Sequence, residues 1–307
     1  MSLAAIDFRD QHGRDAGTLD DITARLLDSS AALSYDPNVE VRWDEPIPAD
    51  HYGLNPEWST LYGTRLWDEM SEGQRILLTR HEVGSIMQTG IWFEMMLQQL
   101  ILRDQYAKNP ADSEFRFALT EIADECRHSL MFARTCEVLD IPQYLPPRAT
   151  VELARFLKTT ARAEQAYGPI LIAEEILDVM QRDWMRGENV VHIVRSTSKI
   201  HVVEESRHMK FARAEIKHSL KSAGRFRREM SAHLFAGAAY FIARAMVSPE
   251  VYVNVGLDKQ RAVEEARHNQ HRKAMMRLSC VHLMDFLADC GLLTRRVMPV
   301  YQSVDMI

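Results

Sequence analysis

Two short segments of the chain repeat the pattern Glu-x-x-His, a pair of residues that can bind one metal ion together. The copies are Glu125-x-x-His128 and Glu205-x-x-His208. On an α-helix, residues three positions apart share a face, so the carboxylate and the imidazole of each copy can reach the same cation. A single copy is weak grounds for a metal site, because both residue types are common on solvated helix surfaces. Two copies with matching partners are stronger.

Each copy has a partner carboxylate at the same interval upstream. Glu94, in an otherwise apolar stretch, precedes Glu125 by the same number of positions as Glu174 precedes Glu205. One constant offset along the chain therefore relates the two sets. A dinuclear carboxylate site in a four-helix bundle needs one Glu from each of two helices and Glu-x-x-His from each of the other two. The neighbouring Glu175 is an alternative to Glu174, and the equal spacing favours Glu174.

A further histidine extends the second copy. His201 precedes Glu205 by four residues and His208 by seven, so the three side chains project within about 60° of one another on an ideal helix. We therefore predict seven metal ligands, four carboxylates and three imidazoles: Glu94, Glu125, His128, Glu174, His201, Glu205 and His208. Such a set favours two iron ions, with manganese as the alternative metal, and argues against structural zinc.

Two acids and a third motif have other interpretations. Asp124 and Glu204 directly precede the two motif glutamates. Each is predicted either to accept a hydrogen bond from the second ring nitrogen of a ligand histidine across the bundle or to lie as a solvated surface acid. The third copy, Glu265-x-x-His268, has no partner acid, because the position at the same interval before Glu265 is Leu234. We interpret the third copy as an ordinary polar helix face.

These residues need long helices to position them, and the sequence predicts such helices. Ser71 and Gln74 form a capping-box signature for a helix that ends at residue 101 or 102. Further helices are expected, with a kink at Pro169, over residues 112–139, 150–186, 189–222, 226–246 and 259–289. No segment shows a convincing alternating β pattern. We therefore predict an all-α fold, a ferritin-like four-helix bundle core with additional N- and C-terminal helices.

The first sixty residues differ from the rest of the chain. They contain four prolines, short apolar pieces and no sustained helical period. We predict an extended N-terminal segment over residues 1–60. A single helical di-iron domain is expected over residues 61–307.

Composition excludes several classes of function. The net charge is −6 and no basic run is present, so nucleic acid is not an expected partner. The longest apolar stretch, residues 235–247, is too short to span a bilayer, so we expect a buried helix there and no membrane partner. The N-terminal residues lack an apolar run, and the four cysteines form no Cys-x-x-Cys pair, which favours a cytoplasmic protein with reduced thiols.

The sequence resembles the non-haem di-iron arylamine N-oxygenases, the family typified by p-aminobenzoate N-oxygenase. Paired Glu-x-x-His motifs are common to di-iron carboxylate proteins, whereas His201-x-x-x-Glu205-x-x-His208 is similar to the pattern of this family in particular. Three shorter segments also resemble it: Leu61-Tyr62-Gly63, Leu66-Trp67-Asp68 and Arg80-His81-Glu82. The resemblance extends from about residue 61 to residue 221.

The resemblance implies an activity, cofactors and partners. Enzymes of this family activate O2 at two iron ions and transfer oxygen to an amine nitrogen, giving a hydroxylamine or nitro product. The resemblance therefore implies two iron ions, O2 as co-substrate, a small-molecule amine substrate and a homodimer. It also implies an external electron donor, a reductase or a ferredoxin.

Other functions are compatible with the same residues. A di-iron hydroxylase or desaturase acting on a C–H bond could use identical ligands, because the pocket selects the target. A radical-generating subunit like that of ribonucleotide reductase is disfavoured, since position 132 is Phe. Iron storage and a metal-free helical interaction module are the non-catalytic alternatives. The second of these leaves Glu94, an acid in an apolar stretch, unexplained.

Overall fold

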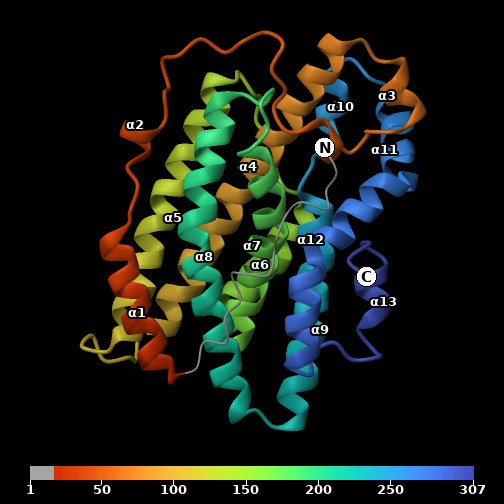
Figure 1. Cartoon of the computed structure of the whole chain (residues 1–307). Helices are drawn as coiled ribbons and strands as arrows, with labels where there is room; N and C mark the ends of the chain where they lie inside the picture. The colour runs from red at the N-terminus through yellow and green to blue at the C-terminus, as the bar shows by residue number, and fades with distance from the viewer. Residues whose placement is uncertain (1–16) are drawn as a thin grey trace.

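The computed structural model describes residues 17–307 and consists of helices joined by mostly short connections. Four long helices form its centre (Figure 1): α4 (Glu72–Gln105), α5 (Ser113–Val138), α7 (Glu164–Trp184) and α8 (His192–Lys221). Within residues 17–307, pairing of extended backbone is limited to an isolated bridge between Tyr52 and Val190. The predicted all-α fold is confirmed.

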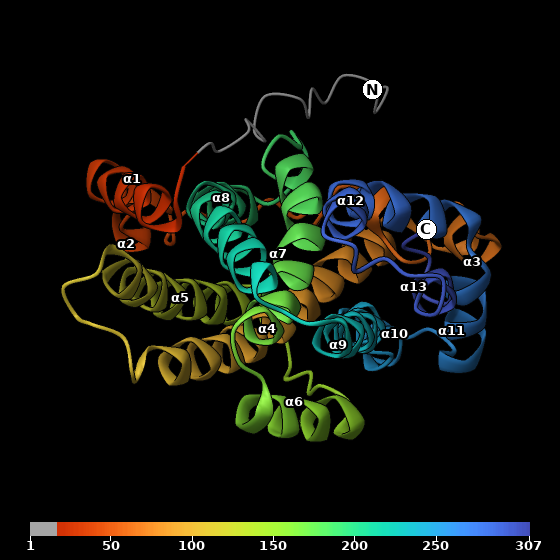
Figure 2. The ribbon, with the colours of Figure 1, turned by 90° about the horizontal axis from the view of Figure 1, so that it is seen from below.

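The four central helices form two hairpin pairs. Helix α4 packs along α5 and α7 packs along α8, and the pairs are joined by contacts of α5 with α8 and of α4 with α7. Figure 2, which views the molecule along the bundle, shows these helices grouped around a common interior. The predicted capping box starts α4, because Gln74 N donates to Ser71 Oγ at 3.3 Å and Ser71 N donates to Gln74 Oε1 at 3.1 Å.

The prediction of one continuous helix over residues 150–186 is wrong. The chain forms two helices there, α6 (Arg148–Thr160) and α7, and the break lies before Pro169. Between the two helices Ala163 adopts a φ of +51°, a conformation that L-residues rarely take and that interrupts a helix. The break lets α6 pack on the outside against α4 and α9 (Arg225–Ala245), while α7 enters the bundle (Figure 2).

The N-terminal segment contains a helix that the sequence reasoning missed. Helix α1 (Leu19–Ala32) begins with a capping box and packs against α5 and α8. Its residues Ile22 and Leu26, one turn apart, are buried. The predicted extended segment over residues 1–60 is therefore wrong where α1 forms. Positions 1–16 lie outside the described part of the chain. The domain boundary stays a prediction. A helix with so few apolar positions has too weak a period to recognise in sequence.

The chain after α8 forms a layer against one side of the bundle. Helices α9 and α12 (Gln270–Asp289) pack against α7. The helix predicted over residues 259–289 is divided into α11 (Lys259–His268) and α12, because the side chain of Asn269 caps the start of α12. The shorter helices are α2 (Pro37–Glu40), α3 (Arg65–Glu69), α10 (Glu250–Asn254) and α13 (Met298–Gln302).

One stretch of this layer, Arg225–Asn254, is long and apolar enough to cross a membrane by length and composition alone. More than half of its most apolar window is nevertheless buried inside the protein, where α9 packs against α7. Phe235 in this helix is fully buried. The burial agrees with the core helix that the sequence predicts over residues 235–247.

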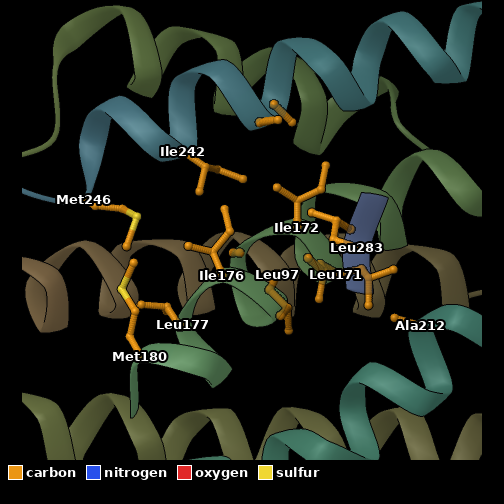
Figure 3. Close-up of a cluster of buried hydrophobic side chains, with 14 of the residues drawn as sticks. Leu97, Leu171, Ile172, Ile176, Leu177, Met180, Ala212, Ile242, Met246 and Leu283 are labelled. Atoms are coloured by element: carbon orange, nitrogen blue, oxygen red, sulfur yellow. The ribbon is translucent and has the colours of Figure 1, made fainter. Parts of the chain in front are cut away.

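The apolar core surrounds α7. Ile172 and Ile176 of α7 belong to one buried cluster with Ile242 of α9 and Leu283 of α12 (Figure 3). Most positions of α7 are buried, which is why the helix is apolar on nearly all sides. Glu174 is an exception in the middle of this helix, and a carboxylate there needs a partner because burying it alone is costly.

Candidate metal centre

The seven predicted ligands converge in the interior of the four-helix bundle. Helix α4 carries Glu94 and α7 carries Glu174, whereas α5 carries the first Glu-x-x-His and α8 carries the second together with His201. All seven are buried, with at most 4% of each residue exposed. Among the seven, three groups of three have ligand atoms within 4.8 Å of one another: Glu94–His128–His201, Glu125–His128–Glu205 and Glu174–His201–Glu205. His208 joins them through Glu125 and Glu205. The helices thus bring the whole set together, and metal binding by it stays a prediction.

The two Glu-x-x-His motifs face each other across the bundle. His128 Nδ1 lies 3.3 Å from Glu125 Oε2 on its own helix and 3.2 Å from Glu205 Oε1 on α8. His208 Nδ1 lies 3.0 Å from Glu205 Oε1 and 3.2 Å from Glu125 Oε1 on α5. Each imidazole therefore faces both motif carboxylates, an arrangement that suits two neighbouring cations sharing carboxylate ligands.

His201 joins the cluster from one turn before Glu205. Its Nε2 lies 3.8 Å from Glu94 Oε1, 3.9 Å from Glu174 Oε2 and 3.8 Å from Glu205 Oε1. Its Nδ1 donates a hydrogen bond to Gln181 Oε1 at 2.7 Å, which leaves Nε2 to face the carboxylates. Burial lowers the pKa of His201 to about 4, so its imidazole is neutral at pH 7 and free to bind a metal. The sequence reasoning missed Gln181, because a lone amide carries no spacing signal.

Burial and mutual repulsion act on the carboxylates. Burial raises the pKa of Glu94 well above its usual value, and the nearby Glu125 raises it further. The pKa of Glu174 is raised first by burial and then by Glu205. Glu174 Oε2 and Glu205 Oε2 are buried and have no hydrogen-bond partner among the described residues. Buried acids with unpaired oxygens are costly to ionise unless a cation lies beside them, so the cluster fits divalent metal ions.

The outer nitrogens of the motif histidines contact acids from the opposite motif. His128 Nε2 lies 2.7 Å from Glu204 Oε2, and His208 Nε2 lies 3.3 Å from Asp124 Oδ2. Of the two interpretations of Asp124 and Glu204, the structure thus supports partners of the histidines, and both acids are buried. Burial alone lowers the pKa of each histidine, but the surrounding carboxylates outweigh it and raise both pKa values well above 6.5. Both imidazoles are therefore protonated in the metal-free protein.

Two arginines lie beside the outer acids, and Arg127 hydrogen-bonds to both of them. Arg127 Nη2 donates to Asp124 Oδ1 at 2.5 Å and to Glu204 Oε1 at 3.2 Å. Arg207 Nη2 lies 3.7 Å from Asp124 Oδ2 and 3.9 Å from Glu204 Oε1. The backbone N–H of Tyr35 also donates to Glu204 Oε1, at 3.1 Å. The sequence reasoning missed the arginines. All three Glu-x-x-His copies read Glu-x-Arg-His, so the shared Arg does not separate the two bundle motifs from the third copy.

The structure distinguishes Glu174 from its neighbour Glu175. Glu175 pairs with Arg213 of α8, whose Nε donates to it at 2.7 Å. Glu174 instead lies in the cluster beside His201. The equal spacing in the sequence therefore selected the acid that faces the predicted ligands.

The third Glu-x-x-His copy lies on α11, outside the four-helix bundle. Glu265 Oε2 accepts a hydrogen bond from Leu66 N at 2.7 Å, and Glu265 Oε1 accepts one from Arg261 Nε at 2.8 Å. His268 is exposed. The motif forms an ordinary polar helix face, as the sequence predicts.

An aromatic ring and two cavities border the site. The ring of Phe132 lies 5.0 Å from that of His201, centroid to centroid, and covers one side of the cluster. Cavities of about 300 and 460 Å³ lie where α1 meets the bundle. Arg207 lines the smaller cavity, and Asp124 and Arg127 line the larger. Both cavities therefore reach the layer of outer acids and arginines.

The match to a known family covers this whole region. A family model described as p-aminobenzoate N-oxygenase AurF matches residues 17–291. The chain belongs to this family. The match includes all four bundle helices and every predicted ligand. AurF-family proteins are di-iron oxygenases with an all-α ferritin-like fold, which agrees with the helices and the buried acid–histidine groups found here.

Curated relatives of this AurF-family protein come from mycobacteria. An uncharacterized protein of Mycobacterium tuberculosis strain CDC 1551 / Oshkosh is 23% identical over 244 residues, which cover 75% of this chain and 69% of that protein. An uncharacterized protein of Mycobacterium bovis shows the same identity and coverage. Neither description names an activity.

Proposed function

We propose that this protein is a di-iron N-oxygenase that activates O2 and transfers oxygen to the nitrogen of a small-molecule amine. The observation that carries the proposal is the buried cluster, in which acids and imidazoles from four helices converge. Membership of an oxygenase family supports it, and the family description names p-aminobenzoate, an arylamine. The substrate class is therefore proposed to be arylamines.

The chain offers a ligand set with the charge that two divalent ions require. Glu94 and Glu174, from separate helices, would hold the ions together with Glu125 and Glu205 of the two motifs. The Nδ1 atoms of the motif histidines and Nε2 of His201 complete the set. Four carboxylates balance the charge of two ferrous ions, and oxygen-rich ligation of this kind suits iron.

The protein's own residues prepare the site for this chemistry. Bound iron would supply the activation of O2, which amino acid side chains do not perform. Glu204 and Asp124 accept hydrogen bonds from the outer histidine nitrogens and so direct Nδ1 of each ring into the cluster. The apolar ring of Phe132 lies beside His201, where it would keep water away from this side of the site. Inserting one oxygen atom into an amine and releasing the other as water consumes a pair of electrons, so the proposal includes a reductase or ferredoxin as donor.

The test uses purified protein loaded with ferrous iron without oxygen. We expect about two iron ions per chain. After addition of a chemical reductant and isotopically labelled O2, mass spectrometry of an arylamine panel should show labelled hydroxylamine or nitro products. Glu205→Gln, which removes one shared carboxylate, is the control and should give none. Products oxygenated only at carbon would identify the hydroxylase alternative, and a protein that binds no metal would remove the proposal.

Three features of the proposal need separate measurements. Competition between ferrous and manganous ions during loading decides which metal the site prefers. Light scattering of the purified protein tests the homodimer that the resemblance implies. The cytoplasmic location stays a prediction, to be checked by cell fractionation.

A further inference from the structure

An eighth acid lies at the cluster beside the seven predicted ligands. Glu121 is on α5, one turn before Glu125, and its side chain is fully buried. Both of its carboxylate oxygens lack a hydrogen-bond partner among the described residues. One of them lies within 4.8 Å of ligand atoms of Glu125 and His208. A buried carboxyl group without a donor is costly to ionise unless a cation lies beside it, and this one faces atoms predicted to bind a metal ion.

Other buried acids of the bundle helices have partners of their own. Glu215 of α8 lies 3.7 Å from the ammonium group of Lys108. Glu175 of α7 is paired with Arg213. Glu121 has neither kind of partner, so burial in the bundle does not by itself explain why an acid occupies this position.

The internal repeat gives Glu121 a counterpart. One constant offset along the chain relates the predicted ligands of the two halves: Glu94 to Glu174, Glu125 to Glu205 and His128 to His208. The same offset relates Glu121 to His201, and each stands one helical turn before its motif glutamate. Glu121 therefore occupies in the α5 half the place that His201 occupies in the α8 half.

The geometry follows the repeat. His201 lies beside the histidine of the first motif, with its ring centroid 4.8 Å from that of His128. Glu121 lies beside the histidine of the second motif, His208. The two additional groups thus extend the cluster at opposite ends.

We propose that Glu121 is an eighth ligand of the metal centre and binds the ion that His208 binds. This inference rests on the proposed two-metal function and adds to it an asymmetry between the ions. One ion gains an imidazole from His201, whereas the other gains a carboxylate from Glu121. Because a carboxylate carries a negative charge and a neutral imidazole carries none, the ion beside Glu121 is held more strongly in the ferric state.

The test compares full-length wild-type protein with Glu121→Gln and Glu121→His, all loaded with isotopically enriched iron. Glu215→Gln is the matched control, since it also removes a buried acid but lies outside the cluster. Mössbauer spectra of the oxidised protein report the two irons separately, and chelator competition reports the affinity for ferrous iron. For E121Q we expect altered parameters for one iron and at least about tenfold weaker binding of one ion, with wild-type values for E215Q.

The histidine variant gives an independent readout. E121H places an imidazole at both related positions, so we expect it to keep two irons whose Mössbauer signals lie closer together than in wild type. Wild-type spectra and affinity in both Glu121 variants would overturn the eighth ligand and leave the two-iron centre intact. A wild-type protein that binds no iron would overturn the proposed function and this inference together.

Discussion

The outer acid Glu204 tests how far the metal centre depends on residues that do not bind the ions. The perturbation is Glu204→Gln, which keeps the size of the side chain. Glu204 Oε2 lies 2.7 Å from His128 Nε2, within the range of about 2.7–2.9 Å of strong charge-assisted hydrogen bonds. The related contact, from Asp124 to His208, is longer at 3.3 Å. The pseudo-symmetric site therefore contains its own comparison, Asp124→Asn.

The size of the effect follows from burial and charge. Burial raises the pKa of Glu204, but the hydrogen bond from His128 and its charge outweigh burial and lower it. The carboxylate is therefore ionised at pH 7, and substitution by Gln removes a full charge. Loss of such a partner weakens metal binding by about 10- to 100-fold, or about 1.4 to 2.8 kcal/mol. The shorter contact places Glu204→Gln at the upper end and Asp124→Asn at the lower end.

The assay is an anaerobic chelator competition with ferrous iron, on wild type and both variants. Glu264→Gln, which removes an exposed carboxylate from α11, is the control and should bind iron as wild type does. Iron binding by E204Q that equals wild type, or that is weakened less than in D124N, would refute the reasoning that these hydrogen bonds orient the histidines.

A change of pH and three substitutions test other parts of the structure. Because the carboxylates raise the pKa of His128 and His208 in the folded protein, their protonation stabilises the metal-free fold below pH 6.5, and this contribution is lost as the pH rises. Calorimetry should therefore show the Tm of the metal-free protein falling above pH 6.5, while iron affinity rises because binding displaces the same protons. Arg213→Met leaves Glu175, the buried acid next to Glu174, without its ion-pair partner. It should lower the free energy of unfolding in urea by about 3 kcal/mol and leave the iron content unchanged. Glu174→Gln, in contrast, should lower the iron content and leave the fold intact. His268→Ala, in the exposed third motif, should change neither iron content nor Tm.

Each of these predictions has a contrary result. A Tm of the metal-free protein that rises above pH 6.5 would show that the motif histidines are not protonated in the fold. Loss of iron in R213M with a stable fold would transfer the ligand role from Glu174 to Glu175. Loss of iron in H268A would make the third motif a metal site.

The long bundle helices can be predicted from the sequence, and several breaks and short helices cannot. The sequence predicts helices over residues 112–139 and 189–222, and the structure has α5 and α8 there within three residues at each end. The sequence reasoning missed the breaks at Ala163 and Asn269. The first depends on where α6 packs, and the second depends on a side-chain cap by Asn269 within a run of polar residues. The sequence reasoning missed helix α1, because its few apolar residues are stabilised only by packing against the bundle.

The candidate site also contains residues that the sequence predicts and residues that it does not. The predicted ligands share a helix period and a repeat offset, both readable from residue numbers. The groups that support them have no such pattern. Gln181 contacts His201, and Ser129 donates to Glu94, through hydrogen bonds between different helices. Glu121 fits the offset but is hard to recognise in sequence, because its counterpart is a histidine.

The order of residues along the chain was enough to group the seven predicted ligands, because the helical period and the repeat are properties of the chain itself. Only the tertiary structure decided which atom of each side chain faces the cluster, and it places Glu174, which the spacing already favours over Glu175, in the cluster. Adjacent residues of a helix point about 100° apart, so packing of α7 against α8, α9 and α12, which sets its rotation, determines which of them faces the cluster.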